Sequence, residues 1–242
     1  MMNILMPLGG DSKFFNRQEY FYPKMLIEIQ GKPMIQHAIE NLQTISKDVQ
    51  FIFIAKKADC SEFHLDETLR LLTNGKCKIT TLDHDTKGAA CSSLLAIDFI
   101  NNEFPLVVAN FDQLFDCDLV SALRELQQMA SDAGCLTFDS THPRWSYVLV
   151  DEKGQVLEAA EKRPISRHAI AGFYYYQRGQ DFVRATQSMI RKSCSSTDTF
   201  YLSPTFNELI LENKVVKAVS IPNEAYHSFY SPQKIEEFEK GL

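Results

Sequence analysis

The sequence has 242 residues, of which 45% are hydrophobic and 23% are charged, as in an ordinary globular protein. A formal net charge of −6 argues against a general nucleic-acid binder. No apolar run approaches the roughly 18 residues of a membrane-spanning helix, and no signal peptide is evident, so we expect a cytoplasmic protein without a membrane partner. The six cysteines are scattered and form no C-x-x-C motif, which favours reduced thiols and argues against a zinc site.

Strand-like and helix-like segments alternate over the first half of the chain. We expect short buried strands over residues 3–8, 50–55, 78–82 and 105–109. Helices are expected from Pro33, which suits the first helical position, and then over 66–72, from Gly88 and over 119–130. This alternation predicts an α/β fold with a parallel, doubly wound sheet, in which ligands bind beyond the carboxyl ends of the strands.

From Gly134 the pattern becomes a mixed one. Strands are expected over 135–138, 145–150, 155–160, 170–176 and 214–221, with a hairpin turn over 151–154. Helices are expected over 180–191, over 204–212 and from Pro232. Because no repeat or linker interrupts the chain, we interpret residues 1–242 as a single domain whose mixed β/α C-terminal extension covers the ligand crevice.

The first candidate site is the loop after the opening strand, Gly9-Gly10-Asp11-Ser12, with lysines at positions 13 and 24. Glycines let a backbone approach a ligand closely, and the N–H groups of such a loop can point at phosphate oxygens. The glycine spacing matches neither the dinucleotide-binding fingerprint nor the P-loop, so a surface turn with two solvated lysines stays an equal alternative.

Two further candidates fall at the same edge of the predicted sheet. Asp112 follows the most apolar strand, where a hard cation could bridge its carboxylate to phosphates, and Asn110 and Gln113 add polar groups. The segment 85–90 combines a hydroxyl, a cation and small residues at a helix start, where backbone N–H groups favour anions or base edges. A plain loop acid and a plain helix cap are the alternatives.

Weaker candidates lie in the second half. Glu161 and Lys162 follow the hairpin and suit a sugar or polyol with its phosphate, although adjacent opposite charges are common on surfaces. His227 is a candidate metal or phosphate ligand, whereas a lone histidine is more often structural.

Taken in order, these segments resemble the sugar-1-phosphate nucleotidyltransferase and cytidylyltransferase family. The matching motifs are residues 8–13 with Pro23-Lys24, 31–34, 86–90, Asp112, Glu161-Lys162 and Gly172 with its aromatic successors. The likeness runs over nearly the whole chain and is closest to members encoded with capsule or lipopolysaccharide genes. It implies a Rossmann-like, GT-A-like fold with a mostly parallel sheet, a nucleotide-binding half over 1–133 and an acceptor-binding half over 134–242.

The resemblance also implies a reaction. A phosphorylated sugar or polyol attacks the α-phosphorus of an NTP, pyrophosphate leaves, and Mg²⁺ is the cofactor; a homo-oligomeric state stays open. The implied catalytic residues are Lys13, Lys24 and Asp112, and the implied metal ligands are Asp112 and His227. The implied nucleotide-binding residues are Leu8, Gly9, Gly10, Asp11, Ser12, Thr86, Lys87, Gly88 and Ala89. The implied substrate-binding residues are Asn110, Gln113, Tyr147, Glu161, Lys162 and Gly172.

Two departures from the family pattern keep alternatives open. Lys13 stands where the family carries an arginine, whose forked guanidinium a lysine does not reproduce. The run 226–232 holds no acid, although the family often supplies a second metal aspartate there. A catalytically weakened relative that binds nucleotide or sugar phosphate as a regulator or scaffold is therefore the main alternative. The other is a GT-A glycosyltransferase using an Asp-x-Asp motif, whose spacing occurs at 83–85 and 116–118.

Overall fold

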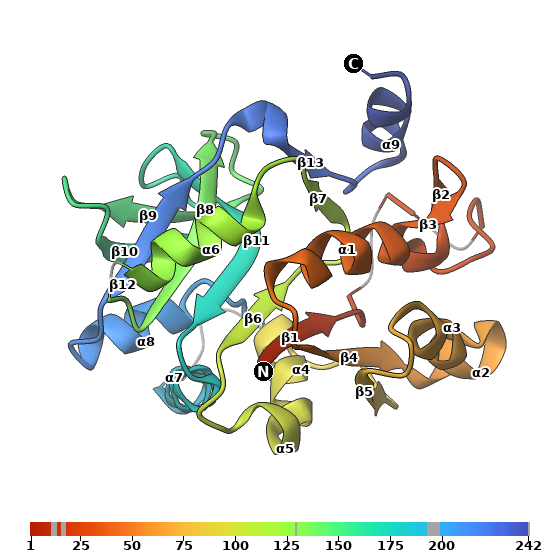
Figure 1. Cartoon of the computed structure of the whole chain (residues 1–242), viewed down its shortest axis with the longest axis horizontal. Coiled ribbons are helices and arrows are strands. Elements are labelled where there is room, and N and C mark those ends of the chain that lie inside the picture. Colours follow the sequence, from red (N-terminus) through yellow and green to blue (C-terminus); the bar gives the residue numbers. More distant parts are fainter. Residues whose placement is uncertain (11–13, 16–17, 129, 193–198, 242) are drawn as a thin grey trace.

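The computed structural model describes residues 1–10, 14–15, 18–128, 130–192 and 199–241 (Figure 1). Its centre is a mixed sheet in which β1 (Met2–Pro7) pairs in parallel with β4 (Val49–Lys56) on one side and β6 (Leu106–Ala109) on the other. β5 (Cys77–Leu82) extends the sheet in parallel beyond β4. The four predicted parallel strands are thereby confirmed.

The second half of the chain continues the same sheet in a mixed sense. β11 (His168–Tyr176) pairs antiparallel with β6 and also with β8 (Ala133–Asp139). The hairpin of β9 (Ser146–Val150) and β10 (Val156–Glu161) continues beyond β11. β12 (Val216–Ser220) pairs in parallel with β8. The strand order over the described residues is β10-β9-β11-β6-β1-β4-β5, with β8 and β12 on a branch from β11.

Side chains alternate between two apolar cores because successive residues of a strand face opposite sides of the sheet. Ile4, Met6 and Phe53 belong to one core, whereas Leu5 and Ile54 belong to the other. Both faces are covered, so the central strands read as continuous apolar runs in the sequence.

Helices cover both faces of the sheet. The first core takes residues from α1 (Met34–Leu42), α3 (Leu65–Leu72), α6 (Leu119–Gln128) and α9 (Pro232–Glu239). The second takes residues from α4 (Ala89–Ser93), α5 (Ile97–Ile100), α7 (Gly179–Lys192) and α8 (Thr205–Leu211). None of the helices in the described ranges is long and apolar enough to cross a membrane.

Several local expectations are corrected. Pro33 belongs to the short strand β3 (Lys32–Pro33) and caps α1 instead of opening it. The helix expected from Gly88 is broken into α4, a 3₁₀ turn and α5. α6 does not continue through Ala130, whose φ is +49°. The sequence also did not indicate α2 (Lys57–Phe63) or β2 (Glu28–Ile29), the partner of β3.

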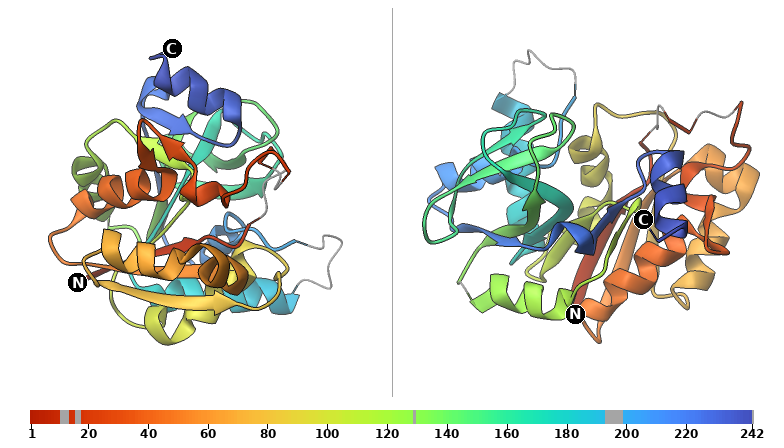
Figure 2. Two further views of the ribbon diagram at one scale, coloured as in Figure 1. Left: turned by 90° about the vertical axis from the view of Figure 1, so that its right-hand side faces the viewer. Right: turned by 90° about the horizontal axis from the view of Figure 1, so that it is seen from above.

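A small second sheet that was not expected closes the carboxyl edge of the large one. β7 (Gln113–Phe115) pairs antiparallel with β13 (Tyr226–Ser228), and the Phe229 N–H donates to the carbonyl of Asp112 at 2.8 Å. The chain then continues into α9. Figure 2 shows α9 beside the β2–β3 hairpin, where the Gln30 N–H donates to Glu239 Oε1 at 2.9 Å. Residues 226–229 therefore lie next to the residues that follow β6.

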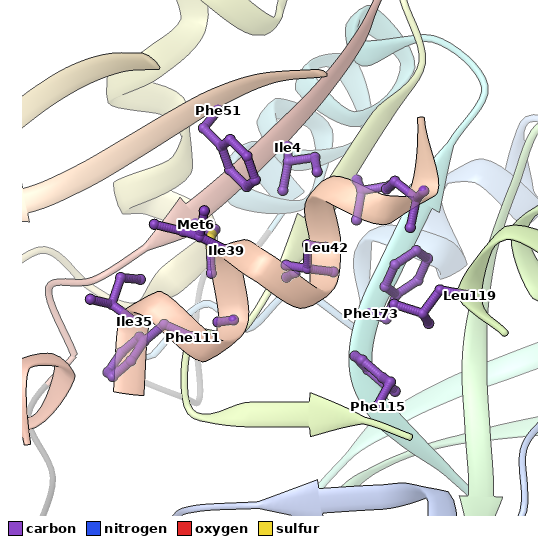
Figure 3. Packing of buried hydrophobic residues seen from close by; sticks show 14 of the residues in the cluster. Ile4, Met6, Ile35, Ile39, Leu42, Phe51, Phe111, Phe115, Leu119 and Phe173 are labelled. Carbon is purple, nitrogen blue, oxygen red and sulfur yellow. The ribbon is translucent and has the colours of Figure 1, made fainter. Parts of the chain in front are cut away.

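The apolar face of α1 provides a test of the first core. Figure 3 shows Ile39 of α1 beside Met6 of β1, and Leu42 of α1 belongs to the same packed cluster. We expect Ile39→Ala to lower the free energy of unfolding by about 2–5 kcal/mol, because it opens a cavity in a packed core. The neighbouring Glu40 points to solvent and pairs with Lys32. Glu40→Ala should therefore change the free energy of unfolding by no more than about 0.5 kcal/mol. Urea unfolding measures both; equal effects would contradict this packing.

Candidate functional site

A cleft of about 620 Å³ opens at the carboxyl ends of β1 and β6. This volume lies within the range of about 300–1,000 Å³ that is usual for small-molecule sites. Of the residues singled out from the sequence, those that line it are Gly9, Gly10, Lys24, Asp85, Thr86, Gly88, Ala89, Asn110 and Asp112. Asp11, Ser12 and Lys13 lie outside the described residues. Leu8 is buried beneath the cleft, in the first core.

An ion pair joins Lys24 to Asp112 at the wall of this cleft. The lysine Nζ donates to Asp112 Oδ2, and only 10% of the lysine side chain and 22% of the aspartate side chain are exposed. The ammonium also lies over the rings of Phe15 and Phe111, at 5.2 Å and 5.6 Å from their centroids. Ring faces attract a cation, and restricted water access strengthens the attraction between the two charges.

The floor of the cleft is held together through Gly172. Its carbonyl accepts hydrogen bonds from the Asn110 N–H at 3.1 Å and from Gln113 Nε2 at 2.9 Å. Tyr226 donates from its hydroxyl to Gln113 Oε1 at 3.2 Å. Gln113 is only 2% exposed, so it shapes the floor from below, whereas the exposed Asn110 side chain faces the cleft.

The segment before α4 forms the opposite wall. Gly88 has a φ of +110°, and a Cβ there would lie 2.5 Å from the carbonyl oxygen of Phe200. The Phe200 N–H in turn donates to the carbonyl of Lys87 at 2.6 Å. Thr86 shares a 2.6 Å hydrogen bond with the hydroxyl of Ser92. The backbone of this wall is therefore fixed by packing, while the Lys87 side chain is exposed and is not among the described residues that line the cleft.

The adjacent charges of Glu161 and Lys162 have different surroundings. Glu161 accepts hydrogen bonds from the hydroxyls of Ser146 and Ser203, and its burial raises the pKa of the carboxyl group above the ordinary value. Lys162 is exposed and donates to the hydroxyl of Tyr201 at 2.6 Å. Neither belongs to the described lining of the 620 Å³ cleft.

Two other candidates lie apart from the cleft. Tyr147 is fully buried, and its hydroxyl donates to the carbonyl of His142 at 2.7 Å. His227 lines a separate cavity of about 230 Å³ against the ring of Phe238, and burial lowers the pKa of its imidazole. The structure thus does not bring His227 into the cleft beside Asp112. Among the described residues, no group of three His, Cys, Asp or Glu side chains could hold a metal ion.

Some lining residues were missed. Ser92, Phe14 and Tyr230 line the cleft beside the predicted residues. Asp85, which the sequence did indicate, forms a 3.0 Å ion pair with Lys56. The guanidinium of Arg144 stacks over the ring of Tyr230, at 3.7 Å from the ring centroid. Nothing local in the sequence connects position 230 with position 112, because β7 and β13 bring them together.

The sequence is similar to those of known nucleotidyltransferases. The family described as nucleotidyl transferase matches residues 19–212. The UTP–glucose-1-phosphate uridylyltransferase AglF of Haloferax volcanii is 23% identical over 159 residues. That match spans 64% of this chain and 63% of the relative, which is less than two thirds of the relative's length.

The fold is also similar to those of solved structures. A nucleoside-diphosphate-sugar pyrophosphorylase from Vibrio cholerae RC9 superposes with a TM-score of 0.85 at 21% identity, over 98% of this chain and 99% of that one. The inositol-1-phosphate CTP transferase from T. maritima gives 0.74 at 15% identity, over 100% and 98% of the two chains. At these identities the likeness shows a shared α/β fold with a mostly parallel central sheet.

The left-handed glycine at position 172 gives a test of the floor. A Cβ there would lie 2.2 Å from Gln113 Oε1 and 2.5 Å from Asn110 Nδ2, at a φ of +61°. Gly154 has a similar φ of +69°, but its Cβ would meet only the carbonyl of Ala218 at 3.5 Å. We expect Gly154→Ala to cost about 1–2 kcal/mol of stability from backbone strain, and Gly172→Ala a further 1–3 kcal/mol or so from overpacking. Thermal unfolding compares the stabilities of the two variants. Equal losses of stability would contradict the close packing of Gln113 and Asn110 around Gly172.

The buried carboxyl group of Glu161 gives a pH test. Its folded pKa lies above the ordinary value of 4.5, so the folded state holds the proton more tightly than the unfolded state. That contribution to stability is present below the ordinary pKa and is lost as the pH rises through the raised folded pKa. Glu161→Gln should therefore gain stability relative to the wild type as the pH rises. Glu158→Gln, on the exposed side of the same strand, is the control; parallel profiles for Glu161→Gln and wild type would refute the expectation.

Proposed function

This chain belongs to the nucleotidyl transferase family, and from that premise we propose that it transfers a nucleoside monophosphate from an NTP to a sugar phosphate or phosphorylated polyol. Pyrophosphate is released, and the product serves the synthesis of a surface polysaccharide. The observation that carries the proposal is the pairing of Lys24 with Asp112 in the cleft at the carboxyl ends of β1 and β6.

Charge and shape support this reaction class. In an open α/β sheet, ligands bind beyond the carboxyl ends of the strands, which is where this cleft opens. Its lining combines a lysine with glycine backbone at Gly9 and Gly10, groups that suit phosphate oxygens. Relatives of the chain carry names that refer to phosphorylated sugars and to inositol-1-phosphate. A phosphorylated acceptor therefore agrees with both the cleft and the family.

The residues present also fit a magnesium ion. Mg²⁺ is commonly held by one or two carboxylates together with substrate phosphates, and Asp112 offers one such carboxylate at the cleft wall. When bound there, the ion would neutralise charge on the transferring phosphoryl group. His227 is not included, because it lines another cavity.

The chain's own groups align the reaction. An oxygen of the acceptor phosphate forms a bond to the α-phosphorus, and the bond from that phosphorus to the bridging oxygen breaks, so pyrophosphate leaves with the electron pair. Lys24 supplies positive charge to the phosphates, and Asn110 orients the reacting groups from the floor. Such catalysis depends on alignment and charge stabilisation and needs no protein nucleophile.

The glycosyltransferase alternative finds less support. Asp118 accepts hydrogen bonds from the backbone N–H and the hydroxyl of Ser121, as a helix cap does, and Asp116 is not part of the described cleft lining. Asp83 pairs with Lys57 at 2.9 Å on the exposed surface. Only Asp85 of the two Asp-x-Asp pairs lines the cleft.

Pyrophosphate release tests the proposal directly. Each of the four NTPs is incubated with Mg²⁺ and a panel of sugar phosphates and phosphorylated polyols, and we expect one combination to release pyrophosphate. Asp112→Asn should lower the rate about 100-fold or more, because it removes charge that acts on the phosphoryl group. Asp116→Asn, which changes an exposed acid outside the described cleft lining, should leave the rate unchanged.

If no combination of NTP and acceptor releases pyrophosphate although the protein still binds nucleotide, the result would instead support a catalytically weakened relative. Equal rates for Asp112→Asn and the wild type would contradict the role given to Asp112. Thermal unfolding of each variant separates loss of rate from loss of fold.

A further inference from the structure

We propose that Lys24 is the resident counter-ion of Asp112 in the free protein, and that it keeps divalent cations off this carboxylate until a triphosphate draws the ammonium away. This inference rests on the proposed function, since it concerns the same cleft. It makes metal binding dependent on nucleotide binding. The evidence is the contact itself, the surroundings of the ammonium and the anchoring of its backbone.

The contact places a positive charge directly on the carboxylate. Lys24 Nζ donates to Asp112 Oδ2, and both side chains are largely withdrawn from solvent. A divalent cation on this carboxylate would therefore meet a fixed positive charge within a few ångströms, where little water screens the repulsion. Among the described residues, Asp112 also belongs to no group of three His, Cys, Asp or Glu side chains that could hold a metal ion.

The surroundings stabilise the ammonium where it lies. The rings of Phe15 and Phe111 flank it at 5.2 Å and 5.6 Å, and ring faces favour a cation over a neutral group. Expelling Lys24 therefore needs a stronger attraction than bulk water offers. The phosphates of an NTP, which carry several negative charges in the same cleft, supply that attraction.

The backbone allows the side chain to move without the chain moving. Lys24 opens the 3₁₀ turn η1 (Lys24–Leu26), and its carbonyl accepts the Ile27 N–H at 3.1 Å. Pro23 precedes it with a φ of −60°, which the proline ring fixes. Only the lysine side-chain torsions have to change when the ammonium passes from the carboxylate to a phosphate.

Binding of Mn²⁺ without nucleotide tests the inference, with electron paramagnetic resonance reporting free and bound metal. The wild type should bind Mn²⁺ weakly at this site. Lys24→Met keeps the apolar stem and removes the charge, so we expect it to bind Mn²⁺ roughly tenfold more tightly or better. The double variant Lys24→Met, Asp112→Asn should lose that gain.

A matched control separates a direct counter-ion from a general change of charge. Lys56 forms a 3.0 Å pair with Asp85, a different acid of the same cleft. Lys56→Met removes the same charge, yet we expect it to leave the Mn²⁺ affinity near that of the wild type. Equal gains in Lys24→Met and Lys56→Met would overturn the inference, as would no gain in Lys24→Met or a gain that survives loss of Asp112.

A second variant guards against misfolding. If thermal unfolding shows that Lys24→Met does not fold, Lys24→Gln takes its place; its neutral amide can still donate to Asp112, and it too should bind Mn²⁺ more tightly than the wild type. The readout needs neither an acceptor nor turnover. A chain that releases no pyrophosphate could still show the gain, and an active enzyme without the gain would overturn only the counter-ion role.

Discussion

The ion pair between Lys24 and Asp112 determines how charge is distributed at the wall of the cleft. It joins residues 88 positions apart, one on a short turn and one just after β6. They meet because β1 and β6 are parallel neighbours, so the segments that follow both strands leave the sheet at the same edge. Its partial burial distinguishes this pair from exposed ones such as Lys32–Glu40, in which nearly half of each side chain is open to water.

The floor beneath that pair is assembled from both halves of the chain. Asn110 and Gln113 come from the first half, whereas Gly172 and Tyr226 come from the second. A buried amide must find hydrogen-bond partners, and Gln113 finds them because β11 pairs with β6 and β13 pairs with β7. The second half of the chain therefore contributes to the floor of the cleft as well as to the region beyond it.

The proteins to which this chain is similar are named for different phosphorylated molecules, glucose-1-phosphate in one case and inositol-1-phosphate in another. The sheet thus determines where a ligand lies, and the side chains around the cleft determine which ligand is bound. In this chain the residues that line the cleft include the aromatic Phe14, Phe111 and Tyr230. Adjacent residues can differ in exposure: the Glu161 side chain is largely buried, whereas the Lys162 side chain is exposed to solvent.

The sequence by itself determined the alternating strands and helices, because hydrophobic periodicity and short apolar runs are local properties. The apolar residues that they mark are the ones buried in the two cores. The sequence also placed Asp112 and the segment around Gly88 at one edge of the sheet. The role given to Lys13 stays a prediction. Tertiary structure alone decided that Lys24 contacts Asp112, that Tyr147 is buried and that His227 faces another cavity. The first depends on the parallel pairing of β1 with β6, the second on the pairing of β9 with β10 and β11, and the third on the pairing of β7 with β13. Each brings together residues from separate strands, and no local pattern in the sequence encodes such a pairing.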